Sequence, residues 1–194
     1  YEVDRADLVG EYIGHTAPKV KAAIEKARGG ILFIDEAYSL ARSGEDSKDY
    51  GKEVIEIIIK EMSDGPGDIA MIVAGYPKEM KVFIDSNPGL KSRFNMYYSF
   101  PDYVPQELMQ IADHAAIKKG VSIEPQARNY LYDALVEGYR TRDNSFGNAR
   151  YVNSIIEEAK MNMGLRLIKN GGMEKYNEQE LSTIKTEDIQ KIFA

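Results

Sequence analysis

Apolar and polar positions alternate in two different ways along residues 1–103. Short apolar runs at 31–34 and 69–74 are rich in β-branched residues, and each follows a turn that contains glycine, which is typical of strands covered on both faces. The stretches around them have helical spacing, with apolar residues at Val20, Ala23, Ile24 and Ala27 and then at Ile55, Ile58, Ile59 and Met62. Thr16 is the candidate N-cap of the first helix. Strands that alternate with helices predict a parallel sheet flanked by helices.

Helical spacing continues without strand-like runs from about Pro105 onward. Apolar residues recur at Leu108, Ile111, Ala112 and Ala115, then at Leu131 and Leu135, and then at Val152, Ile155, Ile156, Ala159, Met163 and Leu167. Pro105 and Pro125 stand where the first turn of a helix accepts proline. We therefore predict an α/β domain over residues 1–103 and a small all-helical domain over residues 104–194, joined near residues 101–103.

The composition is that of a folded protein and excludes several classes of site. The chain has 25 Lys and Arg against 31 Asp and Glu, a net charge of −6, and no cysteine. Without cysteine there can be no disulfide, thiol nucleophile or thiolate zinc site. The acidic balance argues against broad binding to nucleic acid or to an anionic membrane, and no apolar run approaches the ~18 residues of a membrane span. We interpret the chain as cytoplasmic.

The residue pair that carries the most chemistry is Asp35-Glu36, which directly follows the apolar run 31–34. Ligands of parallel α/β sheets bind at the carboxyl ends of the strands, and two adjacent carboxylates there are costly to bury unless they bind something. One interpretation is a Walker-B element, in which Asp35 holds the water shell of Mg²⁺ beside the phosphates of a nucleotide and Glu36 polarises the attacking water. The alternative is a strand end with two solvated acids.

Several sequence motifs, found in a fixed order, extend this interpretation to nearly the whole chain. They are Leu-Val-Gly-Glu-Tyr-Ile-Gly-His-Thr-Ala-Pro-Lys at 8–19, Gly-Gly-Ile-Leu-Phe-Ile-Asp-Glu-Ala-Tyr at 29–38, Ala-Gly-Tyr at 74–76, Asn-Pro-Gly-Leu-Lys-Ser-Arg-Phe at 87–94, Phe-Pro-Asp-Tyr at 100–103 and Phe-Gly-Asn-Ala-Arg at 146–150. In these motifs the chain resembles the AAA+ ATPases of the CbbX and stage V sporulation protein K family. The resemblance implies a P-loop NTPase core with a helical lid, ATP and Mg²⁺ as cofactors, a hexameric homo-oligomeric ring, and a protein or peptide substrate.

The resemblance also implies roles for individual residues. Tyr12, Ile13 and Gly14 match the aromatic pore loop that grips a threaded peptide; the alternative for Tyr12 is ordinary packing at a helix entry. Arg93 matches the arginine finger, which reaches the nucleotide bound on the neighbouring subunit; the alternative is a surface arginine beside a turn. Arg150, which opens a long predicted helix, matches the second sensor of the nucleotide state.

Three further matches are less defined. Tyr76 follows the second predicted strand, where AAA+ proteins place a polar first sensor, but tyrosine departs from the commoner Asn or Thr, and packing is at least as well supported. The polar segment 41–50 matches a second pore loop. His15 is isolated from other candidate ligands, and we interpret it as a loop residue that contacts the backbone of the pore loop.

The sequence departs from the family in the element that holds phosphate. No Gly-x-x-x-x-Gly-Lys-[Ser/Thr] motif occurs in the 194 residues, and in the family this loop lies upstream of the segment that matches residues 1–4. We therefore expect a chain truncated before Tyr1, with a core that lacks its first strand and phosphate loop. In the sheet order of the family, 5-1-4-3-2, the missing strand would be central, between the strand at 70–74 and one near 96–100. Such a chain should bind ATP weakly or not at all, and its free strand edges should favour association.

Two functions from different classes are compatible with the sequence. The first is a motor, in which ring subunits hydrolyse ATP to remodel or thread a protein; Rubisco activation is one option by resemblance to CbbX, and the sporulation relatives have less defined substrates. The second is a regulatory or scaffold subunit that joins such a ring without hydrolysing ATP. Intact Asp35, Glu36 and Arg93 favour the motor, whereas the missing phosphate loop favours the scaffold. A DNA-handling role finds no basic stripe in the sequence.

Overall fold

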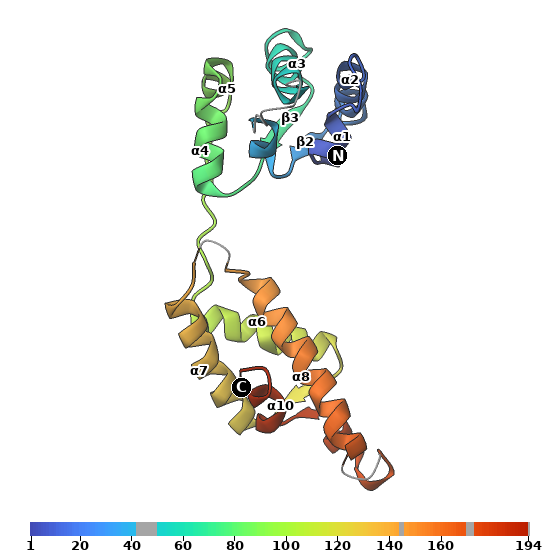
Figure 1. The fold of residues 1–194 in the computed structure, drawn as a ribbon, viewed down its shortest axis with the longest axis vertical. Coiled ribbons are helices and arrows are strands. Elements are labelled where there is room, and N and C mark those ends of the chain that lie inside the picture. The colour runs from blue at the N-terminus through green and yellow to red at the C-terminus, as the bar shows by residue number, and fades with distance from the viewer. Residues whose placement is uncertain (42–49, 144–145, 170–172, 194) are drawn as a thin grey trace. The chain divides into compact units, whose positions relative to one another are not determined.

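The chain forms two compact units, Tyr1–Ser99 and Phe100–Ala194 (Figure 1). The computed structural model describes residues 1–41, 50–143, 146–169 and 173–193. Across these ranges, no helix is both long enough and apolar enough to cross a membrane.

The first unit contains a parallel sheet of three strands. The strands are β1 (Glu2–Val3), β2 (Ile31–Ile34) and β3 (Ala70–Val73), in the order β1-β2-β3. The last residues of the three strands, Val3, Ile34 and Val73, are in register. The residues that follow the strands therefore leave the sheet at one edge, and Asp35 is at the centre of that edge. The predicted strands at 31–34 and 69–74 and their parallel pairing are confirmed.

Helices cover one face of the sheet, whereas the apolar runs predicted strands covered on both faces: on the other face Ile31 and Ile72 are 47% and 43% exposed. The helices are α1 (Arg5–Leu8), α2 (Thr16–Lys26), the 3-10 helix η1 (Ala37–Ala41), α3 (Tyr50–Asp64), α4 (Pro77–Asp85) and α5 (Pro88–Arg93). The central strand supplies Leu32 and Ile34 to the core, both fully buried. Thr16 is not the N-cap as predicted: it is the first helical residue, and its buried hydroxyl accepts a hydrogen bond from the Gly10 N–H at 3.1 Å.

The strand that we predicted near 96–100 does not form. This segment has no regular secondary structure, and Met96, Tyr97 and Tyr98 are each at least 68% exposed. The physical reason is the lack of a partner: a strand needs a neighbour for its backbone hydrogen bonds, and within the described residues β3 is the last strand on its side of the sheet. This strand was predicted from the sheet order of the family that the chain resembles, and that order alone does not make the segment a strand.

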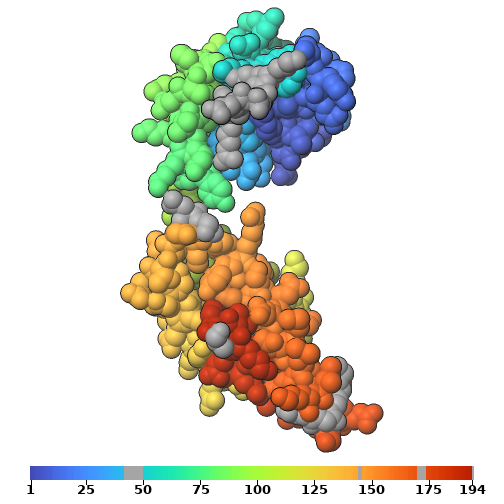
Figure 2. All heavy atoms as spheres, viewed as in Figure 1, coloured from blue at the N-terminus to red at the C-terminus, as the bar shows by residue number. Residues whose placement is uncertain are grey.

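The second unit is a helical lid, as predicted, and also contains a short parallel pair of strands that the spacing did not indicate. Its elements are α6 (Pro105–Lys118), β4 (Ser122–Ile123), α7 (Pro125–Arg140), α8 (Ala149–Lys169), the 3-10 helix η2 (Met173–Lys175), α9 (Glu178–Leu181), β5 (Thr183–Ile184) and α10 (Thr186–Gln190). The core of the lid joins α6, α7, α8 and α10, and Figure 2 shows the carboxyl-terminal residues lying against α7 and α8.

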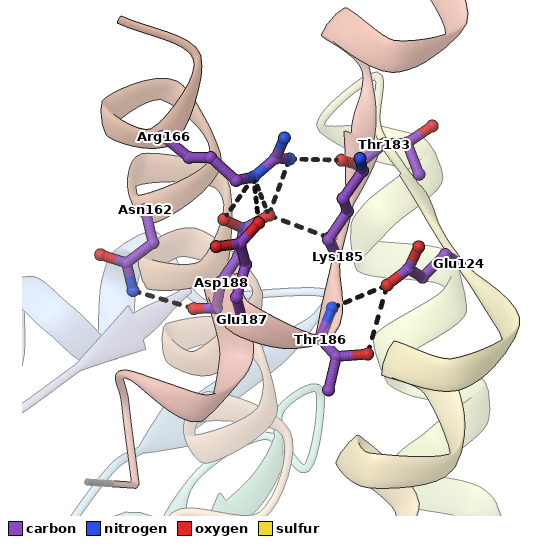
Figure 3. A network of polar contacts seen from close by, with 8 residues as sticks. All are labelled: Glu124, Asn162, Arg166, Thr183, Lys185, Thr186, Glu187 and Asp188. Carbon is purple, nitrogen blue, oxygen red and sulfur yellow. Dashed lines mark hydrogen bonds and ion pairs between the residues drawn. The ribbon is translucent and has the colours of Figure 1, made fainter. Parts of the chain in front are cut away.

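A buried ion pair fastens the short helix α10 to α8 (Figure 3). The Arg166 Nε lies 2.9 Å from Asp188 Oδ1, and the two residues are 5% and 0% exposed. Asn162 donates a hydrogen bond to the Asp188 carbonyl at 2.9 Å, and the Lys185 N–H donates to the Asp188 carboxylate at 2.9 Å. The hydrogen bonds to the Asp188 side chain raise the pKa of Arg166 above its ordinary value. A five-residue helix that would be marginal alone is thus held in place by charge-assisted contacts.

Candidate functional site

The turn after β2 holds two carboxylates at the edge where all three strands end. The Asp35 N–H donates to the Val3 carbonyl at 2.9 Å, and the Ala37 N–H donates to the Ala74 carbonyl at 3.0 Å. The turn is therefore anchored to the strand on each side of β2. Within it, Asp35 Oδ1 accepts a hydrogen bond from the Glu36 N–H at 2.9 Å.

Glu36 has a backbone conformation that is unusual for its residue type. Its φ is +46°, in the left-handed region where residues other than glycine are strained by on the order of 1–3 kcal/mol. Such strain persists only where the surrounding structure fixes it, and the bonds that flank Asp35 and Ala37 do so here. The strain turns the chain sharply at the strand end and places both side chains outside the core.

Both carboxylates are available for a ligand. Asp35 and Glu36 are exposed, and neither forms an ion pair with a side chain in the described ranges. They line a cavity of about 640 Å³, which is also lined by Arg5, Lys19 and Glu11. Acidic and basic side chains thus meet at the carboxyl end of the sheet, the edge where parallel α/β sheets bind ligands.

The donor set fits a magnesium ion that is shared with a nucleotide better than one held by protein alone. Among the described residues, no group of three or more His, Cys, Asp or Glu side chains could hold a metal ion. Mg²⁺ usually keeps several waters and takes one or two carboxylates together with phosphate oxygens, and Asp35 and Glu36 can supply that protein share. The 194 residues contain no phosphate-loop motif.

The segment from Gly10 to Thr16 forms a closed loop that displays two apolar side chains. The Gly10 N–H bond to Thr16 closes its base, and the His15 N–H donates to the Tyr12 carbonyl at 3.1 Å. A Cβ on Gly10 would stand 2.5 Å from the His15 Cβ, so the closure requires glycine there. Tyr12 and Ile13 are 65% and 70% exposed, and Gly14 has a φ of +83°.

The aromatic rings of this loop contact each other and not the core. Tyr12 and His15 pack edge to face, with ring centroids 5.5 Å apart and an interplanar angle of 77°. The loop is thus internally ordered, and Tyr12 is not buried as ordinary packing at a helix entry would require. The role of Tyr12, Ile13 and Gly14 in gripping a peptide remains a prediction.

Arg93, the last residue of α5, is held by neutral oxygen atoms. Its Nε lies 2.9 Å from Ser63 Oγ, which its Nη2 also contacts, and its Nη1 donates to the Gly89 carbonyl at 3.1 Å. In the described part of the chain no carboxylate neutralises its charge, and its contacts do not include Asp35 or Glu36. A fixed guanidinium without an acidic partner is suited to bind an anion brought by another molecule.

The remaining predicted positions lie in exposed places. Tyr76 follows β3 as the N-cap of α4, is 52% exposed, and has its ring 6.3 Å from that of Tyr38. Arg150 is the second residue of α8 and is exposed. The role of Tyr76 as a first sensor, with packing as its alternative, and the role of Arg150 as a second sensor remain predictions. The expected second pore loop is the segment 41–50, of which residues 42–49 lie outside the described residues.

Three residues with long-range contacts at these sites were missed by the sequence analysis. Arg5 Nη1 donates to the Ser39 carbonyl at 2.6 Å, and Lys19 Nζ donates to the carbonyls of Ala6 and Val9 at 3.1 and 3.0 Å. Ser63 holds Arg93. The position of Arg5 shortly before a glycine-flanked loop is a weak sequence signal that it has a role there. No feature of the sequence pattern identifies Ser63.

Comparison with known proteins agrees with this geometry. The family model "ATPase family associated with various cellular activities (AAA)" matches residues 1–102, and the AAA lid domain model matches residues 104–194. Stage V sporulation protein K of Bacillus subtilis (strain 168) is 44% identical over 189 residues, which are 97% of this chain and 57% of that protein. Protein CbbX of Cereibacter sphaeroides is 40% identical over 188 residues, 97% of this chain and 60% of that protein.

The chain therefore spans 57 to 60% of the length of these two relatives. The crystal structure of the FIGL-1 AAA domain matches it with a TM-score of 0.64 at 19% identity, over 98% of this chain and 59% of that chain, which is a likeness of fold. The predicted resemblance and the predicted parallel-sheet core with a helical lid are confirmed. This chain belongs to the ATPase family associated with various cellular activities (AAA) and includes that family's lid domain.

Proposed function

We propose that this protein is a remodelling motor: it hydrolyses ATP between the subunits of a hexameric ring and moves a protein or peptide substrate past Tyr12. The observation that carries the proposal is the placement of two features in one unit. The unpaired carboxylates of Asp35 and Glu36 and the base of the loop that displays Tyr12 line the same cavity, through Gly10 and Glu11. The carboxylates that we assign to nucleotide chemistry and the loop that we assign to gripping a peptide are thus neighbours, which supports the proposal.

The chemistry divides among three side chains. Asp35 would hold the water shell of a bound Mg²⁺, and the strained turn points the Glu36 carboxylate away from the core, where it can polarise the attacking water. A bound Mg²⁺ would neutralise charge on the phosphates. Arg93 of one subunit stabilises the charge that develops on the nucleotide of the next subunit, because its guanidinium is fixed and lacks an acidic partner.

A second candidate is a scaffold subunit that enters the ring without hydrolysing ATP. The left-handed φ of Glu36 argues against a scaffold. A turn that only ended a strand would be free of this strain with glycine at the position, because glycine adopts a positive φ readily. The motor accounts for both the strain and the unpaired acids, so we favour it.

The deciding experiment compares Glu36→Gln with the parent in a form of the protein that carries a phosphate loop. Gln keeps the size of the side chain and removes its negative charge. The motor predicts that Glu36→Gln binds ATP and loses turnover by about 10²-fold or more. Glu11→Gln, at an exposed position on the same cavity, is the matched control and retains turnover. Full turnover in Glu36→Gln, or none in the parent, would favour the scaffold.

A further inference from the structure

The 3-10 helix η1 begins directly after the Asp35–Glu36 turn and is held from the other side by Arg5. The Ser39 N–H donates to the Glu36 carbonyl at 2.8 Å, which closes the first turn of η1 on the strained residue. The Ser39 carbonyl in turn accepts the hydrogen bond from Arg5 Nη1 at 2.6 Å. Two hydrogen bonds, both made by the backbone of Ser39, therefore connect the backbone of Glu36 to the guanidinium of Arg5.

The backbone of Arg5 continues the same path toward the loop that displays Tyr12. Its carbonyl accepts a hydrogen bond from the Val9 N–H at 2.9 Å, and Val9 is followed by Gly10, the first residue of the loop. Lys19, from the helix at the other end of the loop, donates to the Val9 carbonyl. Both ends of the loop are thus attached to the segment that Arg5 anchors.

The position of the Arg5 guanidinium is determined by close packing. Arg5 is half-buried, and a Cβ added to Gly51 would lie 3.0 Å from its Nη1 and 2.0 Å from the Leu40 carbonyl oxygen. Gly51, in the first turn of α3, therefore leaves just enough room for η1 and the guanidinium to meet. A side chain confined in this way transmits a displacement of one neighbour to the other.

We propose that Arg5 is a positioning residue that couples the Asp35–Glu36 turn to the loop carrying Tyr12. This proposal rests on the proposed motor function and adds the path by which its nucleotide site would act on the peptide-gripping loop. Nucleotide chemistry acts on the turn, η1 follows the turn, and Arg5 carries the movement to α1 and the base of the loop. The effect of Arg5 is exerted through its hydrogen bonds with Ser39 and Val9.

The first test measures hydrogen exchange in the 194-residue chain with Arg5→Met, which keeps the apolar stem and removes the guanidinium. Loss of a charge-assisted bond should raise amide exchange by about 10-fold in two separate segments, 9–16 and 37–40. Lys21→Met is the matched control: it removes the same charge from an exposed residue of α2 that makes no hydrogen bond or ion pair in the described ranges. It should leave both segments unchanged.

A rise in only one segment, or in neither, would overturn the coupling. Arg5→Lys separates the connection from general unfolding, because lysine keeps the charge and loses the planar fork of donors. Arg5→Lys should raise amide exchange in 9–16 and 37–40 by a smaller factor than Arg5→Met does. Amide exchange in β2 and α3 should not change. An equal rise throughout the first unit in Arg5→Lys would show that Arg5 serves general stability, and the proposal would fail.

The second test needs ATPase activity and so a form of the protein that carries a phosphate loop. Peptide-stimulated turnover is compared in Arg5→Met, Tyr12→Ala and the double variant. If Arg5 acts through the loop, the double variant loses no more stimulation than Tyr12→Ala alone, whereas multiplied losses would refute the connection. If the parent shows no ATPase activity at all, the proposed motor fails, and the exchange experiment still decides whether Arg5 links the two segments.

Discussion

The guanidinium of Arg93 is held by the hydroxyl group of Ser63, with Nε 2.9 Å from Oγ, and not by a carboxylate. Ser63 lies in the last turn of α3, so one helix fixes the direction of the arginine at the end of another. Neutral acceptors orient the side chain while leaving its charge uncompensated. An arginine arranged in this way is preorganised for an anion, which lowers the entropic cost of binding one.

Arg93→Ala should abolish turnover in an ATPase-competent ring, by about 10³-fold or more, because an arginine finger acts on the transition state. Ring assembly, measured by light scattering, should be unchanged. Ser63→Ala should lower ATP turnover by about tenfold, because the guanidinium of Arg93 remains but loses one neutral hydrogen-bond acceptor. Turnover in Arg93→Ala close to that of the parent would identify Arg93 as a surface residue.

Mixed rings can show that Arg93 acts on the nucleotide of a neighbour. An Arg93→Ala subunit keeps Glu36, and a Glu36→Gln subunit keeps Arg93, so one of the two interfaces between them has both groups. Mixing two inactive preparations should therefore restore part of the turnover, whereas an arginine that acts within its own subunit would leave the mixture inactive.

Tyr12→Ala should abolish substrate remodelling, because it removes the larger of two exposed side chains that the closed loop displays. Basal ATP hydrolysis should persist within about twofold, since the loop closure depends on Gly10 and Thr16 and not on the phenol ring. Tyr12→Phe is the control, because it keeps the ring and should keep remodelling. Remodelling by Tyr12→Ala at the rate of the parent would show that Tyr12 does not grip the substrate.

The sequence predicted those parts of the fold that depend on local pattern. The apolar runs at 31–34 and 69–74 formed adjacent parallel strands, although helices cover only the face that carries Leu32 and Ile34, and Asp35 followed at the expected edge. The strand near 96–100 was predicted from the family's sheet order and does not form, because a strand also needs a neighbour. Local pattern predicts which segments are able to form strands, and pairing determines which of them do so.

The site contained features that no local pattern encodes. The left-handed φ of Glu36 comes from bonds that fix the residues on either side of it to two other strands. Arg5 and Ser39 are 34 positions apart, and Arg93 and Ser63 are 30 apart. Helical spacing placed Met163 and Leu167 in the lid core, but the burial of Arg166 depends on an acid 22 residues away. Such contacts follow from the assembled fold.

Asp188→Ala should destabilise the lid by about 3–5 kcal/mol, because it leaves the buried guanidinium of Arg166 without its partner. It also removes the acceptor for the Lys185 N–H at the start of α10. Glu187→Ala is the matched control: this carboxylate is 57% exposed and 3.6 Å from Arg166 Nε, so its loss should cost at most about 1 kcal/mol. Urea unfolding, with hydrogen exchange of residues 183–190, measures both. Equal effects would show that burial of the pair is unimportant.

Asn148→Ala should raise the pKa of Asp102. The Asn148 amide donates to Asp102 Oδ1 at 2.7 Å, and Arg142 donates to Oδ2 at 2.9 Å; these bonds hold the pKa of the Asp102 carboxyl below its ordinary value, with Asn148 the larger cause. Because the pKa is lowered in the folded state, the contact stabilises the lid above the ordinary aspartate pKa of ~3.9 and is lost as the pH falls through the lowered value.

An NMR titration of the Asp102 carboxyl carbon measures this directly. Asn153→Ala is the control, because Asn153 donates to the Ala149 carbonyl near the start of α8 and does not contact Asp102. The Asp102 titration should move upward in Asn148→Ala and stay in place in Asn153→Ala. An unchanged titration in both would mean that Arg142 alone sets the protonation of Asp102.

The outer edge of β3 should make this chain associate as its concentration rises. Within the described residues β3 pairs with β2 on one side and with no strand on the other, and Ile72 is 43% exposed. An open strand edge with apolar side chains is a template for another strand. Ile72→Lys adds a charge to this edge and should weaken association by about tenfold or more, because pairing would then desolvate an ammonium group.

Val82→Lys, a substitution by lysine at a 68% exposed position on α4, should leave association unchanged, since Val82 lies in a helix and not on a strand edge. Sedimentation velocity over a concentration series distinguishes the cases: equal weakening by both substitutions would point to net charge, and not the strand edge, as the determinant.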